Sequence, residues 1–317
     1  MKNKINRAIS RRLFSSGGVI VLSILIISVL MMFIITSCSQ EIAIDTGEYT
    51  KRPVIEGYIE NGSSPWVCLT YNQAFFTEIN LDFTTPEGMS LLTELFITDA
   101  TVFVSDGSTV DTLQFMIDPA ILEGNYVWPP VKYQGNKIVG QVGGTYNLTV
   151  IIDDETYTAY TTITTPVIPD SIWLEYDKAN EKYCWIHAMI QDNAATADYY
   201  NCFAKRLGRD NYFSECSNCL WDDTYFNGMA FEAIAYRGSS SLFSMDTVNA
   251  ADDKFGAFTV GDTVQLKVVT MDEESFRFWQ SLLNSSVVHS NIDGDAIGVW
   301  CGYGAYYTEP VICVEKP

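Results

Sequence analysis

Histidine and basic residues are scarce in this chain. It has two histidines, and 19 Lys and Arg against 39 Asp and Glu give a formal net charge of −20 at pH 7. Such an acidic surface repels nucleic-acid phosphates and anionic lipid headgroups, so we expect neither as a partner.

Sequence signals for catalysis are also few. His187 alternates with Trp185 and Met189 in a strand-like run, which favours a structural role, and His289 lies in a polar loop. No G-x-S-x-G nucleophile motif occurs. A pair of catalytic carboxylates stays open, but among 39 acidic residues the sequence singles out none. We therefore predict no catalytic residue and expect a non-enzymatic protein.

The chain lacks a second cysteine pair that would complete a zinc ribbon. Cys216 and Cys219 form one C-x-x-C pair, whereas Cys301 and Cys313 are distant in sequence and widely spaced. The context is not that of a thioredoxin motif, so a local disulfide or two loop thiols is the better interpretation.

The remaining cysteines and one acidic loop give no metal signal either. Seven cysteines follow Cys38, so at least one is unpaired within the chain, and Cys68 and Cys184 lie in apolar runs typical of buried cysteines. Asn291, Asp293 and Asp295 are spaced like calcium ligands, but the glycine is misplaced for an EF-hand and the closing glutamate is missing. We predict a turn there, with no metal and no cofactor.

A basic segment and a long apolar run open the chain. Lys2, Lys4, Arg7, Arg11 and Arg12 precede the apolar run from Val19 to Ile35, and Ile35-Thr36-Ser37-Cys38 has the form of a lipobox. We predict a lipoprotein signal peptide at 1–37, lipidation at Cys38 and a polar lipidated tether at 38–52. The alternative is an uncleaved membrane anchor, since the run reaches the lower length limit of a spanning helix. In both cases the rest of the chain lies outside the cytoplasm.

Short alternating runs rich in Val, Ile, Thr and Tyr follow, and turn residues such as Asn61-Gly62 and Asp106-Gly107 separate them. They predict a β-sandwich at 53–165 that resembles the immunoglobulin-like or carboxypeptidase-regulatory-like fold. Phe75 to Leu95 interrupts this pattern, and we expect a loop with one helical turn, either a binding loop or a solvated insertion.

A proline-containing linker at Thr165-Pro166-Val167-Ile168-Pro169 marks a domain boundary. Beyond it, 166–317 is predicted to be a second β-rich, sandwich-like domain with one clear helix at 272–283. Asp272 is placed to cap this helix, and Phe276, Trp279 and Leu283 share one apolar face. The fold class is mostly β, with two tandem β-sandwich-like domains.

Aromatic residues are abundant, and most should pack in the core. Tyr126 and Trp128 are the best exposed candidates for ligand contact, because Pro129 and Pro130 argue against a central strand there. Tyr303 and Tyr306, in the aromatic C-terminal segment, are the second pair of candidates.

Nine segments, in this order, resemble a Bacteroidota lipoprotein family, domain of unknown function 4249. They are Pro53–Ile59, Asp99–Val102, Gly143–Val150, Pro169–Ile172, Tyr199–Tyr200, Asp222–Asp223 with Asn227–Gly228, Gly261–Val264, Ser275–Trp279 and Asn291–Gly298. The chain departs from the family in a shortened stretch between Leu283 and Asn291 and in its extra cysteines.

The resemblance implies a lipid-anchored protein of the outer membrane. Acidic residues after the lipidated cysteine favour display on the outer face in such bacteria, and because only Glu41 is close enough here, a periplasm-facing orientation is the alternative. The resemblance also implies an accessory or ligand-capture role beside a TonB-dependent receptor, since genes of this family commonly neighbour such receptors. The alternatives are a surface module that binds a small ligand, a peptide or a glycan, an adhesive module, or an unrecognised surface hydrolase.

Overall fold

The computed structural model describes residues 50–73, 85–122, 127–238, 254, 256–284 and 287–316, together with residues 21, 23 and 25. Cys38, Tyr126 and most of the predicted leader and tether lie outside these residues. No helix in the described part of the chain is long and apolar enough to cross a bilayer.

The largest sheet combines ten strands from both ends of the described chain. They are β1 (Pro53–Glu60), β2 (Trp66–Tyr71), β5 (Gln114–Ile117), β6 (Val131–Gln134), β11 (Tyr199–Arg206), β12 (Ser214–Glu215), β13 (Trp221–Asp222), β16 (Thr263–Met271), β17 (Ile297–Tyr307) and β18 (Val311–Ile312). The order is β12-β11-β16-β17-β1-β2-β6-β5, with β13 paired to β11 and β18 paired to β16.

Two four-stranded sheets pack against different halves of one face of this large sheet. One has the order β4-β3-β7-β8 and consists of β3 (Thr101–Ser105), β4 (Val110–Thr112), β7 (Thr145–Ile152) and β8 (Glu155–Thr162). The other consists of β9 (Ser171–Tyr176), β10 (Tyr183–Gln191), β14 (Ala230–Ala235) and β15 (Phe258–Thr259), with β10 at its centre. The mostly β, sandwich-like fold expected from the sequence is confirmed.

Separate apolar cores fill these two interfaces. Ile55 and Ile59 of β1 pack with Val102 and Leu148 of the first small sheet. On the other side, Leu266 of β16 packs in one cluster with buried residues of β10 and β15. Because side chains alternate along a strand, the positions between these core residues point to the opposite face of the large sheet.

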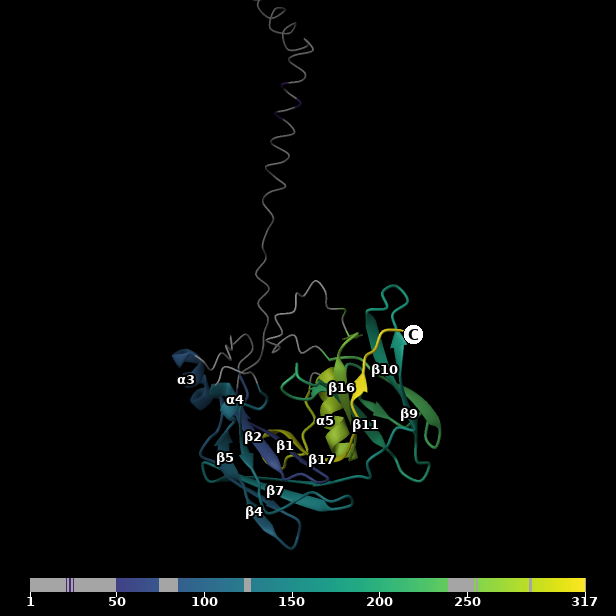
Figure 1. The fold of residues 1–317 in the computed structure, drawn as a ribbon. Helices are drawn as coiled ribbons and strands as arrows, with labels where there is room; N and C mark the ends of the chain where they lie inside the picture. The colour runs from purple at the N-terminus through teal and green to yellow at the C-terminus, as the bar shows by residue number, and fades with distance from the viewer. Residues whose placement is uncertain are drawn as a thin grey trace, which may run out of the picture. The chain divides into compact units, whose positions relative to one another are not determined.

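Three helices lie in the part of the chain described from residue 50 onward. Helix α5 (Glu273–Asn284) confirms the helix predicted at 272–283 and lies in front of β16 and β11 in Figure 1. Helices α3 (Pro86–Leu95) and α4 (Pro119–Leu122) lie near β2 and β5. The expectation of a single helical turn within Phe75–Leu95 is wrong, because α3 has ten residues. Its Pro86 occupies the first helical turn, where proline is favourable, and the Thr85 hydroxyl accepts a hydrogen bond from the Gly88 amide at 3.0 Å.

Parallel pairing between β1 and β17 joins the two halves of the chain. The register runs from Val54 opposite Ile297 to Glu60 opposite Tyr303. The domain boundary predicted at residues 165–166 therefore separates segments that share the large sheet. The described residues from 50 onward form one compact unit.

Candidate functional site

A groove of about 1690 Å³ lies over the large sheet. Its floor uses the face that the two small sheets leave uncovered: Tyr58 of β1, Phe203 of β11 and Tyr303 of β17. The rings of Tyr58 and Tyr303 stack with centroids 5.2 Å apart, and those of Phe203 and Tyr303 are 6.1 Å apart. Strand pairing thus assembles an aromatic floor from segments distant in sequence.

Three tryptophans extend this aromatic surface beyond the floor. Trp66 of β2 lies 4.8 Å from Tyr58 between ring centroids, and Trp279 of α5 stacks on the same tyrosine at 6.4 Å. Trp128, which precedes Pro129, is 40% exposed at the groove. The segment after β11 closes another side and contributes Tyr212, Phe213 and Trp221.

Both lysines of the groove are already engaged. Lys267 pairs with Glu60 and lies 5.2 Å from the ring centroid of Tyr303. The Tyr307 hydroxyl also donates to Glu60, at 2.6 Å, and Lys205 donates to the main-chain oxygen of Asn211 at 3.2 Å. The carboxylate of Glu60 thus balances the charge of Lys267, whereas Lys205 keeps its charge and is held by a neutral acceptor.

The two other carboxylates of the groove lack a basic partner in the described structure. Burial raises the pKa of Glu215, and a hydrogen bond from Asn201 at 2.6 Å partly opposes the shift. Burial likewise raises the pKa of Glu56, opposed in part by hydrogen bonds from Tyr58 and Trp128. The groove therefore offers desolvated carboxylates beside aromatic faces.

Two of the four ligand-contact residues predicted from the sequence line this groove. They are Trp128 and Tyr303. Tyr306 points to the opposite face of β17, since it pairs with Val268, which belongs to the core under the second small sheet. Tyr126 lies outside the described residues.

Sequence reasoning missed most of the groove. In the sequence, four of its aromatic residues look like ordinary aromatic positions of a strand or a helix: Tyr58, Trp66, Phe203 and Trp279. The period-two pattern of β1 could have indicated that Tyr58 shares a face with Glu56 and Glu60. It could not have indicated which distant strands lie beside that face.

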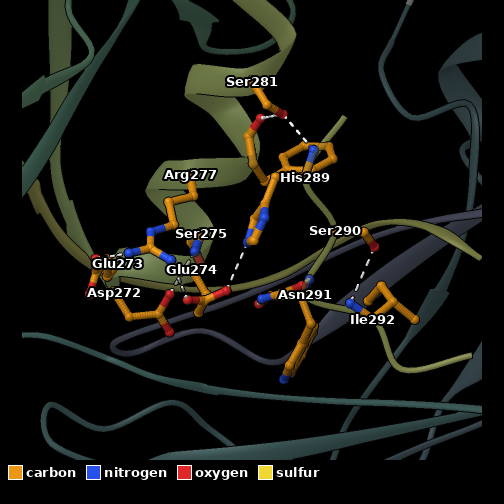
Figure 2. Close-up of polar contacts among 12 residues, drawn as sticks. Asp272, Glu273, Glu274, Ser275, Arg277, Ser281, His289, Ser290, Asn291 and Ile292 are labelled. Atoms are coloured by element: carbon orange, nitrogen blue, oxygen red, sulfur yellow. Dashed lines mark hydrogen bonds and ion pairs between the residues drawn. The ribbon is translucent and has the colours of Figure 1, made fainter. Parts of the chain in front are cut away.

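Helix α5, which carries Trp279, is attached firmly at its start (Figure 2). The Asp272 carboxylate accepts a hydrogen bond from the Ser275 amide at 2.9 Å, which confirms the predicted cap. Its other oxygen accepts from the Thr161 hydroxyl at 2.5 Å, and Thr161 lies in β8. Asp272 thereby links the groove helix to the first small sheet.

Both histidines contact carboxylates. In Figure 2, His289 Nε2 lies 2.8 Å from a Glu274 oxygen, while its main-chain N–H donates to the Ser281 hydroxyl at 2.9 Å. The Ser281 hydroxyl itself donates to the main-chain oxygen of Phe278 at 2.7 Å. Ser281 thus meets the main chain of His289 and not its ring. His187 is buried, with Nδ1 2.6 Å from Glu232.

Buried thiols form two groups. Cys202 and Cys216 have sulfurs 3.9 Å apart, and Cys219 is buried in the same core cluster. The predicted Cys216–Cys219 pair thus has a third member, Cys202, which the sequence did not indicate. Cys184 lies beside Cys313, whose hydrogen bond lowers the pKa of Cys184. The predicted burial of Cys68 and Cys184 is confirmed.

Three carboxylates, Asp192, Asp198 and Asp223, bring oxygens within 4.8 Å of one another. In the described chain this is the one such cluster of metal-ligand residue types. Internal hydrogen bonds engage it: Asp192 accepts from Tyr200 and from the Gly228 amide, and Asp223 accepts from the Asp198 amide. Burial, together with the other two acids, raises the pKa of Asp198.

The side chains of the calcium-like segment 291–295 diverge. Asn291 exchanges two hydrogen bonds with the main chain of Trp300, each 2.9 Å long. Asp295 instead lies at the surface, 3.4 Å from Arg52. The predicted turn therefore braces β17.

Comparison with known families matches most of the chain, including the strands that carry the groove floor. The model of the family described as Domain of unknown function (DUF4249) matches residues 39–304. None of the curated proteins compared with the chain matches it. The match to domain of unknown function 4249 drawn from the nine segments is confirmed, and the chain belongs to the DUF4249 family.

Proposed function

We propose that this protein is a non-enzymatic, ligand-capturing lipoprotein of the outer-membrane surface that works beside a TonB-dependent receptor. The aromatic groove over the large sheet is the observation that carries the capture role. Concave sites with aromatic walls and a few polar groups are where ligands bind most often.

The size of the groove supports an extended ligand. Its volume of about 1690 Å³ exceeds the ~300–1,000 Å³ typical of sites for single small molecules. Rings on several strands provide consecutive stacking positions for peptide or sugar units. The sheet beneath them holds the backbone of these positions in place, which lowers the ordering cost of binding.

The polar groups of the groove support binding over bond cleavage. The Glu60 carboxylate is already engaged within the protein, by an ion pair with Lys267 and a hydrogen bond from Tyr307. Neither histidine lines the groove. These features favour capture followed by transfer of the intact ligand.

Anchoring at Cys38 would confine the groove to the membrane that holds the receptor. A lipid anchor and a short tether raise the effective concentration of the two proteins for one another. The receptor partnership itself rests on the family resemblance, because gene neighbours of this family include such receptors.

Purification of the tagged protein from its native membrane in mild detergent tests the partnership. We expect a TonB-dependent receptor to copurify in stoichiometric amount. Recovery of the lipoprotein alone, with normal growth of a deletion strain on every nutrient that the neighbouring receptor imports, would reject it. A glycan- or peptide-binding adhesive module without a transporter would then be the better function.

A further inference from the structure

Glu56 is one of the two groove carboxylates without a basic partner in the described structure. Its half-buried carboxylate accepts a hydrogen bond from the Tyr58 hydroxyl at 3.1 Å, and no described basic side chain forms an ion pair with it. Transfer of a charged carboxylate out of water is unfavourable unless a counter-charge or hydrogen bonds replace the lost hydration. A cation brought by a ligand would supply that counter-charge.

Aromatic side chains share the groove with this carboxylate. Tyr58, Trp66 and Trp128 line it together with Glu56, and Trp66 packs on Tyr58 with ring centroids 4.8 Å apart. Faces of tryptophan and tyrosine attract ammonium and guanidinium groups, most strongly where water is partly excluded. Carboxylate and rings together form the pattern of an aromatic cage for a cation.

Lysines of the protein already use the same attraction. Lys132 Nζ lies 5.9 Å from the Trp66 ring centroid, and Lys267 Nζ lies 5.5 Å from that of Phe203. The net charge of −20 also draws cationic ligands toward the surface. The local ring contacts and the net charge of the protein therefore both favour a positively charged ligand.

One buried donor points to the chemistry of the rest of the ligand. Trp279 lines the groove, and its Nε1 has no hydrogen-bond partner in the described structure. An indole N–H can only donate, so it calls for an acceptor such as a peptide carbonyl.

We infer that the Glu56 end of the groove, with Tyr58, Trp66 and Trp128, is a subsite for the ammonium or guanidinium group of a basic peptide. The Glu56 carboxylate pairs with the cation, the two tryptophan rings flank it, and the peptide backbone continues over the tyrosine floor. This inference rests on the proposed capture function and specifies its ligand class.

Peptide binding to the full-length protein in detergent, measured by calorimetry, tests the subsite. The probes are five-residue peptides, Ser-Gly-X-Gly-Ser, in which X is lysine, arginine, acetyl-lysine or citrulline. We expect lysine and arginine peptides to bind about tenfold or more tighter than their neutral counterparts. Added salt should weaken this preference.

Matched variants assign the preference to Glu56. Glu56→Gln keeps an acceptor for Tyr58 and should abolish the preference, whereas Glu309→Gln, which changes an exposed carboxylate outside the groove, should preserve it. Trp128→Ala, at a 40% exposed side chain, should weaken binding of the lysine peptide without loss of folding.

The outcomes separate this inference from the proposed function. An unchanged preference in Glu56→Gln, or no binding of lysine or arginine peptides at millimolar concentration, overturns the cation subsite. If neutral oligosaccharides bind instead and Trp128→Ala weakens them, capture by the groove stands and the peptide assignment fails. If no peptide or oligosaccharide binds and no receptor copurifies, the proposed function fails as well.

Discussion

The indole N–H of Trp300 donates a 2.9 Å hydrogen bond to the main-chain oxygen of Tyr146. Trp300 lies in β17 of the large sheet and Tyr146 lies in β7 of the first small sheet, so one side chain fastens two layers. Its ring also fills the space over Gly57, where an added Cβ would come within 2.8 Å of it. This contact holds the strand pair that carries the groove floor.

Replacement of Trp300 should therefore be costly. Trp300 is fully buried, and Trp300→Ala should lower the free energy of unfolding by about 3–5 kcal/mol. The control is Tyr160→Ala at a 67% exposed position of β8, which should change it by less than about 0.5 kcal/mol. Urea unfolding measures both values, and equal effects would show that Trp300 does not fasten the layers.

Asp111 should be a second structural anchor. One of its carboxylate oxygens accepts main-chain hydrogen bonds from Asn136, Lys137 and Ile138 at 2.8, 2.7 and 3.1 Å, and the residue is fully buried. Asp111→Ala leaves buried N–H groups unpaired and should lower the free energy of unfolding by about 3 kcal/mol or more.

Asp106 provides the matched control for Asp111, because it also accepts main-chain hydrogen bonds but in an exposed turn. Water can replace its contacts, so thermal unfolding of Asp106→Ala should be much closer to that of the wild type. If Asp106→Ala lowered the stability as much as Asp111→Ala does, burial would not explain the loss of stability in Asp111→Ala.

Glu56 should make stability depend on pH. Burial raises its pKa above the ordinary 4.5, so the unfolded chain releases this proton at lower pH than the folded chain does. The contribution of Glu56 to stability is then most favourable below pH 4.5 and falls as the pH rises through the folded-state pKa. Glu56→Gln should therefore gain stability relative to the wild type as the pH rises from 4 to 8.

Chemical unfolding of both proteins across that pH range is the measurement for Glu56. The nearby phenols of Tyr58 and Tyr303 have pKa values raised further above their ordinary range, so they stay neutral throughout. The curve of Glu309→Gln should run parallel to that of the wild type. A pH-independent difference between Glu56→Gln and the wild type would contradict the buried carboxylate.

Local elements of the fold could be predicted from the sequence. Alternation and the Asn61-Gly62 turn located β1 and β2, and the Asp272 cap with its apolar face located α5. Helix α3 was underestimated because Pro86 and Gly88 looked like helix breakers. The same proline at the start of a helix stabilises it.

The assembly of the groove could not be predicted from the sequence. Its floor depends on the parallel register of β1 and β17, which places Glu60 opposite Tyr303. No local pattern specifies that pairing, since Asn-Gly and Asp-Gly turns indicate only neighbouring strands. Trp128 was identified because Pro129 and Pro130 excluded a central strand, a signal that Tyr58 and Trp279 do not have.

The anchor is open to a direct test. Cys38→Ala should block acylation and leave an unprocessed precursor, since the lipobox at residues 35–38 supplies the only thiol at that site. Metabolic labelling with a fatty-acid analogue measures this, and Ser39→Ala serves as the control that keeps the thiol. Equal labelling of the wild type and Cys38→Ala would contradict lipidation at Cys38, and the proposed function would then lose its membrane anchor.

Growth of the native bacterium on the nutrient that the neighbouring receptor imports, at limiting concentration, tests the capture role most directly. The strains carry the wild type, the groove variant Glu56→Gln/Trp128→Ala, or Tyr225→Ala at a 93% exposed site outside the groove. At equal protein levels, we expect the groove variant to grow as slowly as the deletion strain and Tyr225→Ala to grow like the wild type. Growth of the groove variant at the wild-type rate, with the deletion strain impaired, would contradict capture by the groove.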